Sequence, residues 1–422
     1  MPLPPARLAG GGRRQTERSN FSDMTGAMYA AIAGLRTHMQ NLNIIGNNVA
    51  NVNTYGYKAS RAVFKTSLYT TLNGGSNGTT SMGGTNPSQI GYGATVSSVD
   101  VDMGAGNYAV TGKPTDLMLD SDGFFLVGSK EIAGNFDGSV DDVNRLTALT
   151  LTRVGNFEFR ADGYLAKEDG NCVYGFLCTG LATEADVTAG RAKKVGDALF
   201  SDQLVPIRYP RVQTVYRNEA GEIVPPNQDG TQPAGTTIGI DIAYPSATGN
   251  GHLLDAGYDP DLEDSPLAQA RFQNISFDPN TGIITGTCKD TEEVVTIGCI
   301  AIGNVTNPNG VTNLGDNYYK AGKGSGSLTI SVLGGNAANM HITQVNQSLQ
   351  ANDNTADGNG YVVGLTAYSD TGHIISSGLE MSTTDLAQEI SQMILTQRGY
   401  QANTRIVTVT DSMLEELVNM KR

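Results

Sequence analysis

The chain has 422 residues, 28 of them basic and 42 acidic, which gives a formal net charge of −14. This charge disfavours nucleic-acid binding, because phosphate contacts need clustered lysine and arginine side chains. No apolar run approaches the roughly 18 residues of a membrane-spanning helix, so we expect no membrane insertion. The length predicts two to four domains, and 52 glycines indicate many strands and turns.

Residues 1–23 are rich in proline, glycine and arginine, and they precede a second methionine, Met24. They lack the apolar region of a cleaved secretory signal peptide. We interpret residues 1–23 as a disordered extension or as the product of a misassigned start codon.

A seven-residue apolar period begins after Met24 and predicts a helix over about Thr25–Val52. Gly56 suits the left-handed backbone that commonly follows a helix end. A tract rich in Gly, Ser, Thr and Asn starts at Asn73, and we expect residues 57–92 to form an extended connector. The residues with the seven-residue period are Met28, Leu35, Leu42 and Val49.

From Gly93 the hydrophobic period changes to two, which predicts strands. Asp-Gly pairs at 122–123, 162–163 and 169–170 separate short alternating runs, so the strands should be antiparallel. We assign residues 93–180 and 269–375 to an inner β domain. Residues 181–268, where prolines interrupt short apolar runs, are predicted to form an inserted outer β domain.

The seven-residue period returns at the end of the chain and predicts a long helix from about Ser382 to Met420. Ser382–Asp385 resembles a capping box. Gly399 and the β-branched run from Ile406 to Thr410 should weaken the helix locally. Its predicted seam comprises Leu379, Leu386, Met393, Tyr400, Val407 and Leu414.

We therefore predict an α+β fold. Residues 24–56 and 376–422 should form a terminal helical core domain, in which long helices make a coiled-coil layer, and nested antiparallel β domains should occupy the middle of the chain. An apolar stripe on a lone helix leaves apolar surface in water, and a lone helix is marginally stable. We expect the ten seam residues to be an assembly interface that orders when copies of the chain dock.

No catalytic, cofactor-binding or metal-binding group emerges from the residue pattern, and we predict no enzymatic activity. The four cysteines have neither zinc-ligand spacing nor the number expected of a disulfide scaffold, so buried free thiols are the favoured interpretation. The four histidines are scattered, and Asp120–Gly123 lacks the remaining ligands of a calcium loop, which favours a turn.

Both ends of the chain carry signature-like stretches: Gly34–Arg36 and Leu42–Lys58 near the start, and Leu379–Ala387 and Gln397–Asn403 near the end. These stretches resemble the signatures of bacterial flagellar rod and hook proteins. Asp120–Phe125, Thr152–Phe157 and Ile297–Pro308 resemble the inner β domain of these proteins. The signature positions at the two ends are Gly46, Asn47, Asn48, Asn51, Gly56, Lys58, Gln397, Arg398 and Asn403.

The resemblance implies a structural subunit that polymerises with itself into a helical tube in the bacterial flagellum. Implied partners are the rod, the hook cap, the hook–filament junction proteins and the type III export apparatus, which would deliver the chain to the extracellular surface. The insertion after Tyr164-Leu165 favours a hook-type member, whose flexible tube would transmit torque from rod to filament. A distal rod protein of the basal body stays open as an alternative, as does a secreted adhesive or carbohydrate-binding β protein.

Overall fold

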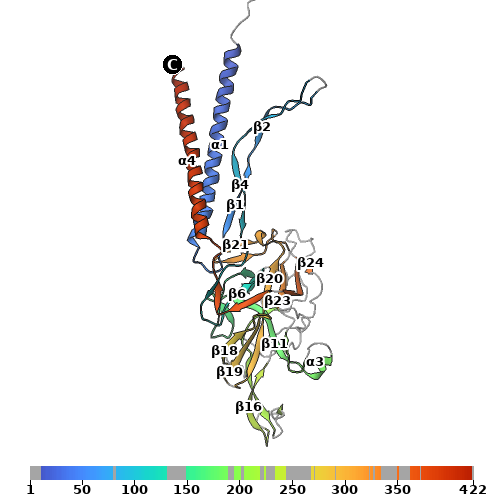
Figure 1. The fold of residues 1–422 in the computed structure, drawn as a ribbon. Coiled ribbons are helices and arrows are strands. Elements are labelled where there is room, and N and C mark those ends of the chain that lie inside the picture. Colours follow the sequence, from blue (N-terminus) through green and yellow to red (C-terminus); the bar gives the residue numbers. More distant parts are fainter. Residues whose placement is uncertain are drawn as a thin grey trace, which may run out of the picture. The chain divides into compact units, whose positions relative to one another are not determined.

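The computed structural model falls into two compact units, each built from separated stretches of the chain (Figure 1). The helical unit contains Met1–Asn53, Lys58–Asp102 and Thr384–Arg422, and the β unit contains Thr54–Tyr57 and Met103–Thr383. The structure describes residues 11–78, 82–130, 149–188, 194–200, 204–218, 223–224, 233–243, 268–269, 271–289, 291–322, 324–326, 328–333, 349–350, 362–370 and 372–420.

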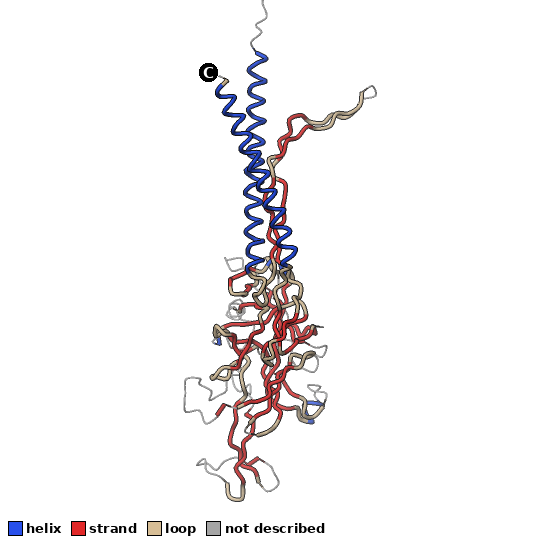
Figure 2. Tube along the Cα trace, turned by 60° about the vertical axis from the view of Figure 1, so that its left-hand side comes forward, coloured by secondary structure: helices blue, strands red, loops and turns tan. Residues whose placement is uncertain are grey.

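Two long helices of opposite direction lie side by side in the helical unit: α1 (Gly11–Ala50) and α4 (Leu386–Asn419) (Figures 1 and 2). Residues 11–23, predicted to be disordered or untranslated, are helical. Arginine, glutamine and glutamate in this stretch favour helix, and the last proline before it is Pro5. Residues 1–10 of the predicted extension lie outside the described residues.

The last helix begins at Leu386 rather than at Ser382. Asp385 is its N-cap, and the Asp385 carboxylate accepts hydrogen bonds from the amides of Ala387 and Gln388 (2.9 and 3.2 Å). Gly399 and the run from Ile406 to Thr410 are helical throughout.

Residues 60–101 form two antiparallel ribbons of the helical unit, where we predicted an extended connector and the start of the inner β domain. The first pairs β1 (Ser60–Thr66) with β4 (Ala94–Val101), and the second pairs β2 (Tyr69–Asn73) with β3 (Ser88–Gly91). Pairing satisfies the backbone donors and acceptors that a bare connector would leave to water. The Thr37 hydroxyl of α1 donates to the Ala94 carbonyl (2.8 Å), which ties the first ribbon to the helix.

The β unit is mainly antiparallel, as predicted, and its largest element is a closed barrel of strands. Within the described residues, one pair in it, β23–β25, is parallel. The barrel strands are β6 (Asp116–Asp120), β7 (Phe124–Gly128), β8 (Thr150–Thr152), β9 (Gly155–Phe159), β10 (Leu165–Lys167), β11 (Cys172–Leu181), β12 (Ala198–Phe200), β13 (Val205–Pro206), β18 (Phe272–Phe277), β19 (Ile283–Cys288), β20 (Val294–Val305), β21 (Thr312–Gly315), β22 (Tyr318–Lys320), β23 (Leu328–Leu333), β24 (Leu349–Gln350), β25 (Val362–Asp370) and β26 (His373–Ser376).

Smaller elements complete the β unit. A separate sheet holds β14 (Arg211–Arg217), β15 (Ile223–Val224), β16 (Thr237–Ala243) and β17 (Ala268–Gln269), and β5 (Tyr108–Val110) pairs with β27 (Gly378–Glu380). Short helices are α3 (Glu184–Thr188) and η2 (Pro308–Gly310). The small sheet falls largely within the predicted insertion, but β12 and β13 pair with β11 of the barrel. Residues 244–267 of that insertion lie outside the described residues.

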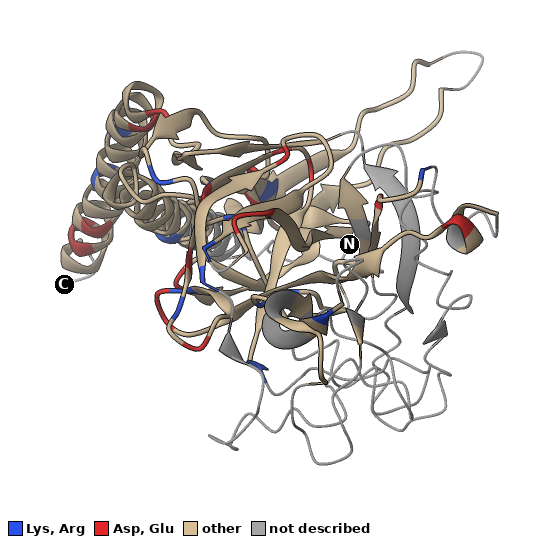
Figure 3. Ribbon diagram, turned by 90° about the horizontal axis from the view of Figure 1, so that it is seen from below, with Lys and Arg blue, Asp and Glu red and all other residues tan. Residues whose placement is uncertain are grey.

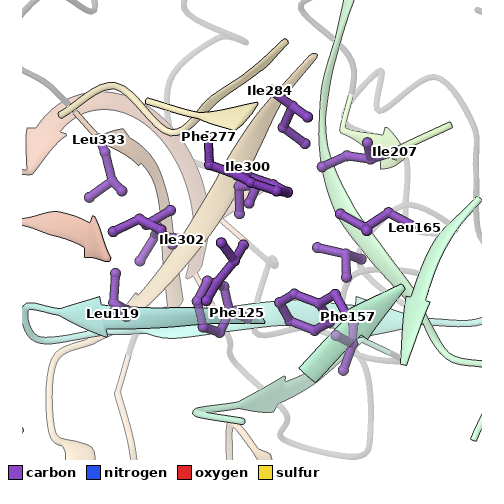
Figure 4. Close-up of a cluster of buried hydrophobic side chains, with 14 of the residues drawn as sticks. Leu119, Phe125, Phe157, Leu165, Ile207, Phe277, Ile284, Ile300, Ile302 and Leu333 are labelled. Carbon is purple, nitrogen blue, oxygen red and sulfur yellow. The ribbon is translucent and has the colours of Figure 1, made fainter. Parts of the chain in front are cut away.

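Strand β7 is buried on both faces, which explains its unbroken apolar sequence. Phe124 and Leu126 belong to one buried cluster, while Phe125 and Val127 belong to the second. In the second cluster, the rings of Phe125 and Phe157 meet edge to face with centroids 5.2 Å apart (Figure 4). The barrel is therefore packed with side chains on both sides of this strand.

Candidate assembly surface of the terminal helices

Two side-chain hydrogen bonds join α1 to α4. Asn41 Nδ2 donates to Thr396 Oγ1 and Asn48 Nδ2 donates to Glu389 Oε1, both at 2.9 Å. The two bonded residues are thus seven positions apart on each helix, in opposite order along the chain. We call these two pairs the polar ladder. Glu389, Thr396 and Thr410 are the buried residues of α4.

Asn48 also anchors the first ribbon. Its Nδ2 donates to the Ser60 carbonyl (2.8 Å) and its Oδ1 accepts from the Ser60 amide (3.0 Å). One buried amide side chain therefore joins α1, β1 and α4. A residue with both donor and acceptor atoms is needed for this, which gives a physical reason for asparagine at this signature position.

Two glycines let the helices approach closely beside the ladder. A Cβ on Gly34 would lie 2.6 Å from Asn403 Nδ2, and one on Gly399 would lie 2.8 Å from the His38 ring. Each glycine thus faces a polar side chain of the other helix. We predicted Gly399 as a weak point of the helix, and the structure adds a packing reason for a glycine there.

The ten predicted seam residues differ in burial and in the element to which they belong. Leu379 is buried, but in β27 of the β unit, so its assignment to the helical seam is wrong: Asp385 caps the helix after it. Leu386 and Tyr400 are exposed. The remaining seven are half-buried, and their role as an assembly interface stays a prediction: Met28, Leu35, Leu42, Val49, Met393, Val407 and Leu414.

Sequence reasoning missed the buried polar residues because it followed apolar residues alone. Glu389, Thr396, Asn403 and Thr410 repeat at the same seven-residue interval, three positions after the apolar seam. This second period was visible in the sequence, but a period alone does not show which residues of α1 the polar side chains meet.

Large apolar side chains on both helices face solvent in the single chain. Leu395 is 71% exposed and Tyr29 65% exposed. Apolar surface of this extent marks an interaction site. We call the following set the exposed apolar face: Tyr29, Met39, Ile390, Ile394, Leu395, Ile406, Val409, Met413, Leu417 and Val418.

The other signature residues have varied surroundings. Asn51 Nδ2 donates to the Asn47 carbonyl (2.9 Å) and to Asn47 Oδ1 (3.0 Å) at the end of α1. Lys58 is buried, and Gly56 has a left-handed backbone with φ of 66°. Gly46, Gln397 and Arg398 are exposed.

Charged side chains and thiols are the remaining groups that could carry chemistry. Lys and Arg are interspersed with Asp and Glu over the described ribbon (Figure 3). The prediction of buried free thiols is confirmed for all four cysteines, and burial raises the pKa of Cys172 and of Cys178 to about 11. Across the described ranges, no three His, Cys, Asp or Glu side chains gather to hold a metal ion, and no helix is long and apolar enough to cross a membrane.

Comparison with known proteins shows relatives along nearly the whole chain. The family model of flagella basal body rod proteins matches residues 28–58, and that of the flagellar basal body rod FlgEFG protein C-terminal region matches residues 375–420. The flagellar hook protein FlgE of Borreliella burgdorferi is 26% identical over 465 residues, covering 94% of this chain and 100% of the relative. The chain is thus similar to flagellar hook and rod proteins along nearly its whole length.

Other flagellar proteins match over the same span. The flagellar basal-body rod protein FlgG of Bacillus subtilis is 26% identical over 399 residues, and the hook protein FlgE of Escherichia coli is 23% identical over 440 residues. Each match covers 94% of this chain and all of the relative. A solved structure of Helicobacter pylori FlgE2 aligns with a TM-score of 0.30 and 12% identity, over 65% of this chain and 100% of that one.

Proposed function

We propose that the chain is a structural subunit of the bacterial flagellar hook, which polymerises with itself into a flexible tube that transmits torque from rod to filament. The observation that carries this proposal is the exposed apolar face. Because these large apolar side chains are exposed in the single chain, they are available for contact with other copies. Relatives named flagellar hook protein, from Borreliella burgdorferi, Treponema pallidum and Escherichia coli, support the hook assignment.

The size of the exposed apolar face favours cooperative assembly. Covering the exposed halves of about ten such side chains contributes on the order of 10 kcal/mol. Association costs roughly 4–15 kcal/mol in lost translational and rotational freedom. A single neighbour that covers part of the face contributes too little free energy to offset this cost, so contacts with several neighbours must form together.

The ribbon β2–β3 is a second surface that needs a partner. Its strands are exposed along their whole length, and no charged residue occurs from Thr66 to Val99. A lone two-stranded ribbon is marginally stable in water, and uncharged edges invite pairing with other chains. Leu68 and Met82, which are 79% and 75% exposed, add apolar surface for a neighbouring copy.

In the proposed polymer, the terminal helices form the predicted coiled-coil layer. The polar ladder lies within each chain, and the exposed apolar face lies between chains. The β unit supplies the predicted inner and outer β domains. Rod, hook cap, hook–filament junction and type III export apparatus are the proposed partners, and the polymer lies outside the cell after export.

The distal rod is the second candidate function. It is favoured by the Bacillus subtilis relative named FlgG, which spans the same 94% of the chain. A secreted adhesive or carbohydrate-binding β protein is disfavoured, because the relatives over most of the chain carry flagellar names.

Electron microscopy of the purified protein over a range of concentrations tests the proposal. We expect monomers below a threshold concentration and hollow tubes above it. Curved, flexible tubes support the hook, whereas straight, stiff tubes support the rod. Monomers at every concentration would contradict both.

A further inference from the structure

The chain passes between its two units at four places. The β-unit segments that adjoin these places all involve one residue, Glu380. The passages follow Asn53, Tyr57, Asp102 and Thr383. The adjoining β-unit segments are therefore Thr54–Tyr57, the residues after Met103, and those before Thr383. Glu380 on β27 contacts the first two segments and belongs to the third.

Glu380 holds these segments through both its backbone and its side chain. The Gly56 amide donates to the Glu380 carbonyl oxygen (2.8 Å), and the Gly106 amide donates to Glu380 Oε1 (2.7 Å). The neighbouring Met381 amide donates to the Asn107 carbonyl (2.8 Å). The Thr383 amide donates to the Tyr57 carbonyl (3.2 Å).

Arg153 supplies the opposite charge. Its Nη1 lies 4.0 Å from Glu380 Oε2 and donates to the Leu119 carbonyl of β6 (3.2 Å). The guanidinium lies over the Phe124 ring of β7, 5.5 Å from its centroid. The two side chains are 2% and 0% exposed. Arg153 thereby connects Glu380 to two strands of the packed barrel.

Gly56 fits this arrangement only without a side chain. Its backbone is left-handed, and a Cβ would lie 2.6 Å from Val154 Cγ2 and 3.3 Å from the Arg153 carbonyl carbon. The Asn317 amide side chain donates to the Tyr55 carbonyl (3.1 Å), which is a further bond to the same segment.

We propose that Glu380, held by Arg153, is a positioning residue that fixes the β-unit segments at all four passages to the barrel. We call Glu380 and Arg153 together the joint. A buried ion pair adds little net stability by itself, because both charges lose their water. Its benefit here is geometric, since one carboxylate fixes segments that are far apart in sequence. This inference rests on the proposed function. In a polymer that transmits torque, force that arrives along any of the four passages reaches the barrel through the joint.

Hydrogen exchange on the purified subunit, below its assembly threshold, tests the joint. Glu380→Gln keeps the shape of the side chain and removes its charge. We expect exchange at the amides of Gly56, Gly106 and Met381 to rise at least tenfold together, with amides of β7 and β11 unchanged. Arg61→Gln is the control, because its pair with Asp100 (3.7 Å) is exposed, and it should leave all five regions unchanged.

Two outcomes would overturn the joint: unchanged exchange at the three amides, or a uniform rise that includes β7 and β11. Should Glu380→Gln not fold, Arg153→Lys keeps the charge with fewer donors and should raise exchange at Gly106 by a smaller factor.

A second experiment shears assembled tubes by flow. Tubes of Glu380→Gln should break into fragments less than half the wild-type length, and equal lengths would contradict the role of the joint in transmitting force. Wild-type protein that forms no tubes refutes the proposed function, while the exchange data still decide the joint.

Discussion

Single glycines show where the backbone, rather than a side chain, sets the structure. Gly56 and Gly112 both have left-handed backbones, with φ of 66° and 75°. A Cβ at Gly56 would overlap Val154, whereas at Gly112 no described atom lies within 4 Å of it. The two positions therefore separate the cost of backbone conformation from the cost of overlap.

Alanine at the two positions should destabilise the protein by different amounts. Gly112→Ala should lower the free energy of unfolding by about 1 kcal/mol, because only the backbone is strained. Gly56→Ala should lower it by roughly 2–4 kcal/mol, because overlap with Val154 adds to this strain. Urea unfolding of both variants measures the difference, and equal losses would refute the packing at Gly56.

The buried thiols give a prediction at the same scale. Burial raises the pKa of Cys172 and Cys178 to about 11, so at pH 8 neither should react with an alkylating reagent until the protein unfolds. A raised thiol pKa means that the folded state binds the proton more tightly than the unfolded state. Stability should consequently fall as the pH rises from about 9 to about 11. Rapid alkylation of folded protein at pH 8, followed by mass spectrometry, would contradict the burial.

Helices and ribbons show which elements the sequence predicts and which it does not. The long helices were predictable, because a seven-residue apolar period extends over many turns. Strands β1 to β3 were not, because they adjoin a tract rich in Gly, Ser, Thr and Asn that is typical of connectors, whereas the alternating run at Ala94–Val101 did predict β4. Leu379 was misassigned because it lies seven residues before Leu386, although the Asp385 cap separates the two.

The contact between the helices depends on non-adjacent partners and was missed for that reason. A helical period shows which residues share a face, but it does not show which face meets the other helix. The Arg153–Glu380 pair illustrates the same limit, since the barrel topology brings together residues that are distant in sequence. Both features involve buried polar groups, whose partners a single sequence does not reveal.

A double-mutant cycle on Asn48 and Glu389 tests the polar ladder. Each of Asn48→Ala and Glu389→Ala should destabilise the helical unit, because each leaves a buried polar partner without its hydrogen bond. Their coupling energy should be about 0.5–3 kcal/mol. Asn47 and Gln397, exposed on the same two helices, provide the control pair, and a coupling there as large as at the ladder would contradict the assignment.

For the whole molecule, the central claim is that the two ends of the chain are completed by other copies. The polar ladder joins α1 to α4 within a chain and leaves the exposed apolar face on the outside. The closed β unit buries its own core and does not need this face. A change at that face should therefore stop assembly without unfolding the subunit.

The most direct measurement compares tube formation by Ile394→Glu/Leu395→Glu with that by Gln397→Glu, which adds one negative charge at an exposed polar site of the same helix. Because both apolar side chains are more than half exposed, the free energy of unfolding of the monomer should change by no more than about 0.5 kcal/mol per substitution. We predict that electron microscopy shows tubes for the wild type and Gln397→Glu, and monomers alone for the double variant. Tubes of the double variant at the wild-type threshold concentration would contradict the account.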